Sequence, residues 1–333
     1  MKFENWELQL LDAGYGDSIF ISIKLAVREY NILIDGGLKS TYFNAKNRRS
    51  PSGPLKLLLD DLKDKERCID LLVVTHIDDD HIGGICKWFE MDFPENNFVK
   101  QVWLNNDMYI NNNNDLNNSV DKTISVLKKL QKNQIYHRYD IVEGMTMSND
   151  FCTIRVIAPK VDSRNIVAKK LKASLDNTTK NASLPSINEL LQQDWIMKPN
   201  SDENKASIAF ELEIWDGTKL LLLGDAEYED IMDGLNKFYK NCKEKLEYNY
   251  VKLSHHGSRN NFNPLFLDRI LAKAYIVSTN GSQYGHPDKE VLAQIISKSD
   301  SSIIFNNESV MKSIFCEQDF IDYPNLHKRI CIF

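Results

Sequence analysis

Three apolar runs, each followed closely by histidine or aspartate, constrain the fold of this chain more than any other feature. The runs and the residues that follow them are 71–75 before His76, 219–223 before Asp225, and 250–253 before His255 and His256. Short apolar runs bounded by glycine or polar residues are typical of buried strands. Three such strands that all end in potential metal ligands are strong evidence that these side chains form one metal site.

The first of these motifs has the densest set of ligands. Four ligand-type side chains occur within six residues: His76, Asp78, Asp80 and His81. Imidazole and carboxylate groups together suit zinc, manganese or iron. An acidic helix start would explain the aspartates through the helix dipole, but it would not explain two flanking histidines. We therefore interpret the motif as a metal site, with a Gly83-Gly84 turn opening a helix after it.

The other two motifs would complete a pair of metals. Asp225 follows a buried strand and a glycine, where a carboxylate could bridge two ions. Alternate residues of a strand point to opposite faces, so we expect one of His255 and His256 to be a ligand and the other not. Which of the two binds is left open.

The rest of the chain indicates an α/β protein. Nine strand-like runs are recognised: 8–11, 18–23, 31–34, 71–75, 154–158, 208–215, 220–223, 251–253 and 275–278. Helical patterns lie between them, as in Val120, Ile124, Leu127 and Leu130, which share one helix face. We predict a single domain over 1–333, with polar insertions at 105–118 and 163–205.

Composition narrows the classes of function. Lysine and arginine number 41 against 47 aspartates and glutamates, a net charge of −6. Such a balance argues against a whole-molecule basic surface that coats nucleic acid or membrane. No secretory apolar region or 18-residue apolar stretch is present, and the six cysteines form no CxxC pair. We expect a cytoplasmic protein with reduced thiols and no membrane partner.

The chain resembles the metallo-β-lactamase fold superfamily, and within it the hydrolase domain of the competence DNA-uptake protein ComEC. The motifs that carry the resemblance occur in the family's order at 11–18, 34–37, 75–84, 224–227, 254–258 and 284–287. The resemblance implies a four-layer αββα sandwich with two metal ions at the edge between its sheets. It covers most of the chain.

The resemblance also implies roles for individual residues. His76 and Asp78 would hold the first metal, Asp80 and His81 the second, Asp225 would bridge them, and His255 or His256 would complete the second site. Asp35 would orient ligands from beneath the metal loop, and Asp17 and Ser207 are assigned supporting roles of the same kind.

Two departures from the superfamily's familiar pattern bear on the metal. The motif His-x-His-x-Asp-His becomes His76-x-Asp78-x-Asp80-His81, as in the ComEC branch. The third-motif histidine has no counterpart, because the corresponding stretch reads Asn204-Lys-Ala-Ser207. The first metal would then have few, mostly carboxylate ligands, which leaves zinc against manganese open.

The function implied is a metal-dependent hydrolase, best suited to phosphodiesters of a nucleic acid or nucleotide, with a metal-bridging hydroxide as nucleophile. Alternatives are a lactone- or thioester-cleaving hydrolase, or a regulatory subunit on this scaffold with protein partners that the sequence does not identify. Asp80, His256 and His286 are the residues expected to take part in catalysis, the histidines as proton donors. A polyanionic substrate would also need nearby cations, for which Lys205, Lys252 and Arg259 are the candidates.

Overall fold

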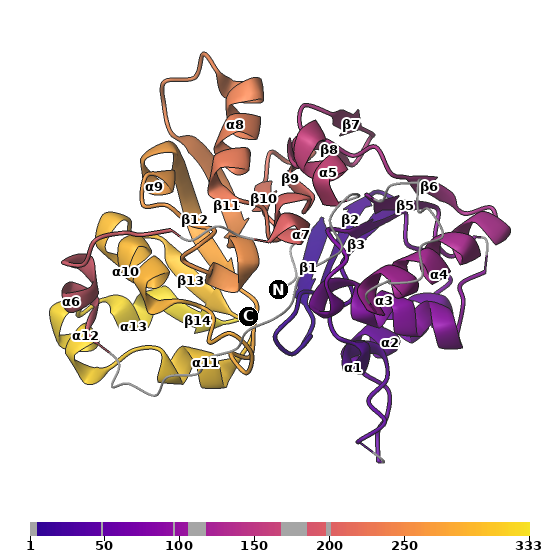
Figure 1. Ribbon diagram of the computed structural model, residues 1–333, viewed down its shortest axis with the longest axis horizontal. Coiled ribbons are helices and arrows are strands. Elements are labelled where there is room, and N and C mark those ends of the chain that lie inside the picture. The colour runs from indigo at the N-terminus through magenta and orange to yellow at the C-terminus, as the bar shows by residue number, and fades with distance from the viewer. Residues whose placement is uncertain (1–4, 48, 96, 106–117, 168–184, 198–200) are drawn as a thin grey trace.

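Two β-sheets form the centre of the computed structural model, which describes residues 5–47, 49–95, 97–105, 118–167, 185–197 and 201–333 (Figure 1). The first sheet has the order β1 (Trp6–Leu10), β2 (Ile19–Leu25), β3 (Arg28–Ile34), β4 (Leu71–Val74), β5 (Gln101–Leu104) and β6 (Tyr136–Arg138). The second has the order β14 (Ile330–Ile332), β13 (Ser302–Phe305), β12 (Ile270–Val277), β11 (Leu246–Lys252), β10 (Lys219–Leu222), β9 (Ala209–Ile214), β8 (Cys152–Ala158) and β7 (Thr146–Ser148).

Apolar side chains that point alternately to the two sides of a strand give each sheet two apolar faces. In β2, Ile19 and Ile21 face a core shared with the second sheet, whereas Phe20 between them faces the outer helices. In β12, Ile276 lies in the shared core and Tyr275 faces outward. Successive side chains of a strand point to opposite sides, so this pattern places the two sheets face to face.

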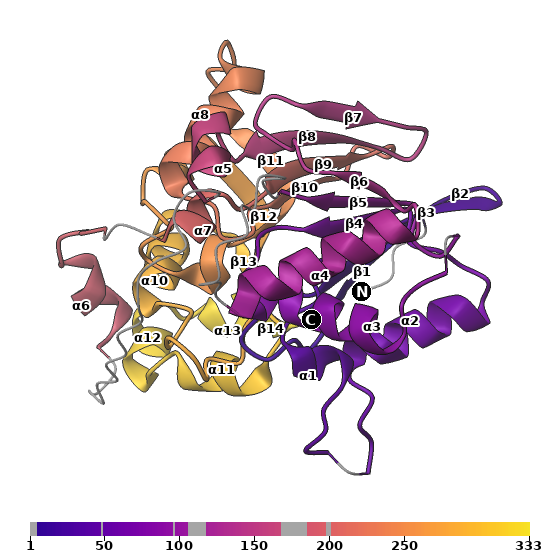
Figure 2. The ribbon, with the colours of Figure 1, turned by 45° about the vertical axis from the view of Figure 1, so that its right-hand side comes forward.

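Helices cover both outer faces. The outer face of the first sheet packs against α2 (Pro54–Asp64), α3 (Asp79–Met91) and α4 (Asn118–Lys132), and Figure 2 shows α3 and α4 lying across it. The second sheet packs against α6 (Ile187–Leu191), α8 (Tyr228–Tyr239), α9 (Phe266–Arg269), α10 (Lys289–Lys298) and α13 (Leu326–Arg329). The shorter helices are α1 (Lys39–Tyr42), α5 (Val161–Val167), α7 (Asp202–Lys205), α11 (Glu308–Ser313), α12 (Glu317–Asp322) and the 3₁₀ turn η1 (Ser254–Gly257).

The prediction of a four-layer αββα sandwich is therefore confirmed. All nine runs predicted as strands correspond to strands of the two sheets. The sequence reading missed β5, β6, β7, β13 and β14, which have three or four residues each. Runs this short contain too few residues to show a period of two.

One local prediction was wrong. Gly83 and Gly84 do not form a turn that opens a helix, because they lie within α3. A Cβ atom on Gly84 would stand 2.0 Å from the carbonyl oxygen of Gly36. The N–H of Gly84 also donates to the carbonyl oxygen of Gly37 at 2.8 Å. Glycine thus lets α3 press directly onto the loop that follows β3.

The two predicted insertions fall partly outside the described residues. Most of the first insertion (106–117) and the middle of the second (168–184) lie outside the described residues. The described portion of the second insertion includes α6, which buries Ile187 and Leu190 against the helices of the second sheet. Its last helix, α7, carries Asn204 toward the strand ends discussed below.

In the described part of the chain, we find no helix that combines the length and the apolar character needed to cross a bilayer.

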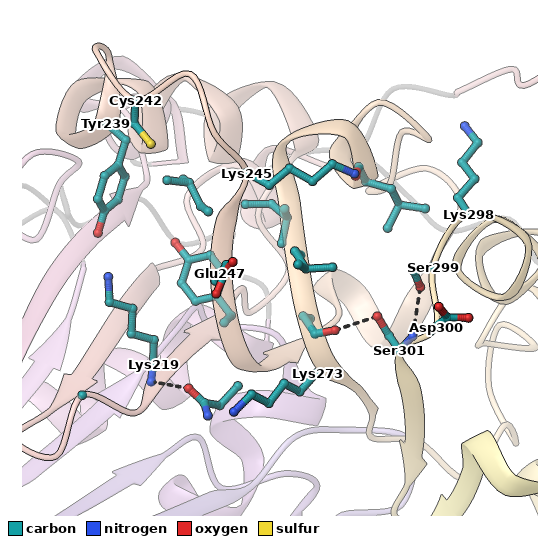
Figure 3. A pocket seen from close by; sticks show the side chains of 18 residues that line it. Lys219, Tyr239, Cys242, Lys245, Glu247, Lys273, Lys298, Ser299, Asp300 and Ser301 are labelled. Atoms are coloured by element: carbon teal, nitrogen blue, oxygen red, sulfur yellow. Dashed lines mark hydrogen bonds between the residues drawn. The ribbon is translucent and has the colours of Figure 1, made fainter.

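A groove of about 890 Å³ lies at the opposite ends of the strands from the histidines and aspartates. It is bordered by Leu246 and Ile270, the first residues of β11 and β12. Figure 3 shows Lys219, Lys245, Lys273 and Lys298 spread around it. Because the ligand-type residues follow the carboxyl ends of the strands, this groove is separate from them.

Close packing of α8 on β8 generates a test of the fold. A Cβ atom on Gly234 in α8 would stand 1.8 Å from the backbone carbonyl oxygen of Ile157. We predict that Gly234→Ala lowers the free energy of unfolding by about 1–3 kcal/mol, although alanine favours helices over glycine. Urea unfolding measures this, with the exposed Asn236→Ala of the same helix as control, expected to change stability by less than about 0.5 kcal/mol. Equal stability of both variants would contradict the packing.

Candidate metal centre

The ligand-type residues converge where strand ends of the two sheets meet. His76 follows β4 of the first sheet, Asp225 follows β10 of the second, and His255 follows β11. A hydrogen bond from Ile208 N to Thr75 O, at 2.9 Å, joins the two sheets beside them. Since β10 and β11 are parallel, their carboxyl ends lie at one edge, which brings their following residues together.

Asp225 lies at the centre of this cluster and is buried. Its Oδ1 atom is 3.4 Å from Nε2 of His81. Its Oδ2 atom is 3.7 Å from Nε2 of His76 and 3.6 Å from Nε2 of His255. The two oxygens of one carboxylate therefore face different imidazoles.

Asp78 and Asp80 add two more carboxylates to the cluster. Oδ2 of Asp78 lies 3.6 Å from Nε2 of His76. Oδ2 of Asp80 lies 4.0 Å from Nε2 of His81 and 3.6 Å from Nε2 of His256. We name the two groups the first donor set (His76, Asp78 and His255) and the second donor set (Asp80, His81 and His256), with Asp225 between them.

Buried atoms without partners indicate what the cluster could hold. Nε2 of His76, His81 and His256 and Oδ1 of Asp225 have no hydrogen-bond partner among the described residues, although all four are buried. Buried polar atoms are nearly always paired, so four such atoms in one cluster are suited to bind a ligand. Lone-pair nitrogens and carboxylate oxygens are metal ligands, and the residues present therefore fit a pair of divalent cations.

The two adjacent histidines do not point to opposite faces as expected. His255 and His256 have φ angles of 47° and 57°, in the left-handed region. Alternation holds only for extended backbone, and here the strand has already ended. Both imidazoles turn into the cluster, one in each donor set. Such backbone strain in non-glycine residues is typical of functional sites.

His255 lies in the first donor set, which corresponds to the metal for which the sequence offered few ligands. Its Nδ1 lies 3.0 Å from Oδ1 of Asn261 and 3.1 Å from Nδ2 of Asn204. Asn261 in turn donates to the carbonyl oxygen of Asp225 at 2.8 Å. Asn204, from the stretch that lacks a histidine, thus positions His255 in the first donor set.

Asp35 holds the loop after β4 from below, and it is buried. Its carboxylate accepts hydrogen bonds from Thr75 N at 2.8 Å and Thr75 Oγ1 at 2.7 Å. The same carboxylate lies 2.9 Å from Nδ1 of His81. A bond at Nδ1 leaves Nε2 of His81 free to face Asp225, which is how ring orientation is set in metal sites.

Ser207 and Ser278 hold further residues of the cluster in position. The hydroxyl oxygen of Ser207 accepts from Asp225 N at 3.0 Å and lies 3.5 Å from Nδ1 of His76. Nδ1 of His256 donates to the carbonyl oxygen of Ser278 at 2.8 Å. Each of these contacts leaves the Nε2 atom directed at the cluster.

Asp17 is paired with a buried lysine that the sequence reading assigned elsewhere. Nζ of Lys252 lies 2.6 Å from Oδ2 of Asp17 and donates to the carbonyl oxygen of Leu253 at 3.0 Å. Oδ1 of Asp17 is 3.5 Å from Nδ1 of His256. Asp17 also stands with His81, Asp225 and His256 in a group whose ligand atoms lie within 4.8 Å of one another.

The three cations expected to face a polyanionic substrate have carboxylate neighbours. Lys252 is buried against Asp17, so the prediction that it contacts substrate was wrong. Arg259 bonds Glu290 at 3.0 Å, and Lys205 lies 3.9 Å from Glu227.

The charges of the cluster depend strongly on one another. Burial opposes ionisation of Asp225, but His255, His81 and His76 hold the pKa of its carboxyl well below the usual range. Burial disfavours protonation of His256, yet Asp17 outweighs it and raises its pKa to about 9. The pKa values of His76 and His81 are raised as well, whereas burial lowers the pKa of His255. Protons therefore favour three of the four imidazoles when no cation is present, and a metal ion would compete with them.

His286 lies beside the cluster. Its ring centroid is 5.1 Å from that of His255, and its Nδ1 is 3.5 Å from Oδ2 of Asp288. Asp288 is held by the backbone N–H of Arg259 at 2.7 Å. His286 is thus positioned next to the first donor set.

Comparison with known proteins gives a limited sequence likeness. No family model matches the chain. ComE operon protein 3 of Bacillus subtilis (strain 168) is 22% identical over 295 residues, which is 86% of this chain. The match covers 30% of that protein, so the chain spans about a third of the length of this curated relative. The likeness agrees with the resemblance recognised in the motifs.

Solved structures are similar at low identity. A possible metal-dependent hydrolase from Veillonella parvula is 15% identical, with 99% of this chain and 96% of that chain covered and a TM-score of 0.43. The metallo-β-lactamase fold protein YhfI from Bacillus subtilis is 11% identical, with 91% and 97% covered and a TM-score of 0.43. With scores below 0.5, these likenesses do not identify the reaction, which must be argued from the chain's own residues.

The central position of Asp225 generates a test. We predict that Asp225→Ala weakens binding of both cations by at least about 100-fold, because one carboxylate faces both donor sets. Metal content after dialysis, measured by inductively coupled plasma mass spectrometry, checks this. Asp79→Ala is the control, since Asp79 belongs to the same motif as Asp78 and Asp80 but to neither donor set. Two tightly held ions in Asp225→Ala would exclude a bridging role.

The Asp17–Lys252 pair gives a second prediction. Lys252→Met should lower the free energy of unfolding by about 3–5 kcal/mol, because it leaves a buried carboxylate without its cation. The double variant Asp17→Asn/Lys252→Met should recover a large part of that loss. Urea unfolding measures both, with the exposed Lys245→Met as control. A loss no larger than that of the control would show that the pair is unimportant.

Proposed function

We propose that this protein is a metal-dependent hydrolase that cleaves phosphodiester bonds with two divalent cations, one in each donor set. The observation that carries the proposal is the arrangement of Asp225, whose Oδ1 faces His81 while Oδ2 faces His76 and His255. Two ions held by such a group would supply hydroxide at neutral pH and neutralise charge on the substrate.

The chain's own residues then have distinct tasks. The first donor set would hold one cation and the second donor set the other, with Asp225 shared. Each position combines imidazole and carboxylate ligands, which suits zinc or manganese. Asp35, Ser207 and Asn204 keep the imidazoles oriented through the contacts described above. Lys252 neutralises Asp17 beneath the site and so takes no part in binding substrate.

A phosphodiester fits this arrangement for an electrostatic reason. Charge develops on both the attacking and the leaving oxygen during an in-line displacement, and two neighbouring cations can stabilise both. The leaving oxygen also needs a proton, and histidine is the usual donor near neutral pH. With His255 and His256 both facing the donor sets, we assign this task to His286, which lies against His255.

Turnover with defined metals tests the proposal. Protein reconstituted with zinc or with manganese should hydrolyse bis-p-nitrophenyl phosphate and an oligonucleotide, and chelation should abolish the activity. Hydrolysis of lactones or thioesters without any phosphodiester turnover would replace the proposal with a small-molecule hydrolase. Failure to bind metal at all would favour a regulatory subunit.

The role assigned to His286 generates a separate prediction. His286→Ala should retain normal metal content but lose about one to three orders of magnitude in kcat, the range that one proton-transfer group supplies. Steady-state kinetics together with metal analysis measure this. His327→Ala serves as control, because His327 is an exposed residue of α13. Full turnover by His286→Ala would make His286 an ordinary loop residue, and loss of a metal would make it a ligand.

A further inference from the structure

Two tyrosines from separate loops stand together beside the candidate metal centre. Tyr15 belongs to the loop between β1 and β2, and Tyr284 to the loop between β12 and α10. Their ring centroids are 6.5 Å apart, and the rings are nearly perpendicular, at 88°. A backbone hydrogen bond from Asn280 N to Gly14 O, at 2.9 Å, joins the two loops. We call this pair the aromatic corner.

The aromatic corner is connected to both donor sets. On one side, the ring of Tyr284 lies 6.3 Å from that of His286, which lies 5.1 Å from His255 of the first donor set. On the other side, Gly16 follows Tyr15 directly, and a Cβ atom on Gly16 would stand 1.8 Å from the carbonyl oxygen of Asp80. The corner therefore adjoins the place where a substrate's reacting group would be held.

Tyr284 is the central residue of a tight turn, in which Gly285 N donates to the carbonyl oxygen of Gln283 at 2.8 Å. The residue is 57% exposed and has a φ of 60°, a region that large side chains rarely adopt. A buried side chain could repay such strain through contacts, but more than half of this residue remains accessible. Strain at an exposed aromatic residue beside a reactive cluster points to binding.

Charge also favours aromatic recognition here. Lys252 and Arg259, which could have contacted a phosphate backbone, are each bonded to a carboxylate. A contact with the base would therefore add affinity that these paired cations do not supply. A nucleobase stacks on an aromatic side chain without regard to sequence, and a second ring at right angles can contact its edge.

We propose that Tyr15 and Tyr284 stack the base of a nucleotide whose phosphate lies at the donor sets. This proposal rests on the proposed function and narrows it to substrates with an unpaired base: nucleotides or single-stranded nucleic acid. A base paired within a duplex is stacked on its neighbours and cannot enter the aromatic corner. Single-stranded oligonucleotides should accordingly have a lower KM than the same sequence in a duplex.

Binding measurements test the aromatic corner without any turnover. Isothermal titration calorimetry on the metal-reconstituted protein should give a lower Kd for thymidine 5′-monophosphate than for 2-deoxyribose 5-phosphate, by about 5- to 150-fold. Tyr284→Ala should reduce this ratio toward one, Tyr15→Ala should also lower it, and Tyr284→Phe should preserve it. Tyr136→Ala is the matched control, since Tyr136 is 60% exposed but lies on β6.

Equal Kd values for the two ligands in the wild-type protein would overturn the proposal, and so would a ratio that survives Tyr284→Ala. These outcomes are separable from failure of the proposed function. If no phosphodiester is hydrolysed but the base-dependent ratio collapses in Tyr284→Ala, the aromatic corner stands and the reaction assigned to the site is wrong. If phosphodiesters are cleaved while the base contributes nothing, only the aromatic corner is excluded.

Discussion

The buried carboxylate of Asp225 is the group around which the rest of this structure is organised. Ionised carboxylates are costly to bury unless opposite charge or hydrogen bonds compensate them. Compensation comes from imidazoles that follow β4, lie in α3 and follow β11, three elements that belong to different layers of the sandwich. Ser207 bonds the backbone N–H of the same residue. Holding one charge in this way requires the strand ends of both sheets to meet at one point.

The surrounding contacts serve the orientation of rings more than the filling of space. Nδ1 of His81 faces Asp35 and Nδ1 of His256 donates to Ser278 O, which leaves both Nε2 atoms toward the cluster. His255 and His256 reach their positions only through a left-handed backbone. Strain and unpaired buried atoms both cost stability, and together they indicate a site whose partners are cations.

Local patterns predicted the strands and the donor-rich motifs, whereas the four layers were implied by the family resemblance. Apolar runs such as 71–75 show buried strands, and donors that follow neighbouring parallel strands, such as Asp225 after β10 and His255 after β11, share one edge of a sheet. The pairing of Lys252 with Asp17 depends on residues 235 positions apart, which no local pattern reveals. The turning of both adjacent histidines inward depends on φ angles, and the alternation rule does not apply after a strand ends. The strands β5, β6, β7, β13 and β14 were not predicted because they are short.

Anomalous diffraction from crystals grown with manganese or zinc would test the central claim most directly. The account predicts two peaks, one contacted by His76, Asp78 and His255 and the other by Asp80, His81 and His256, with one oxygen of Asp225 on each. A single ion, or two ions without Asp225 between them, would contradict it.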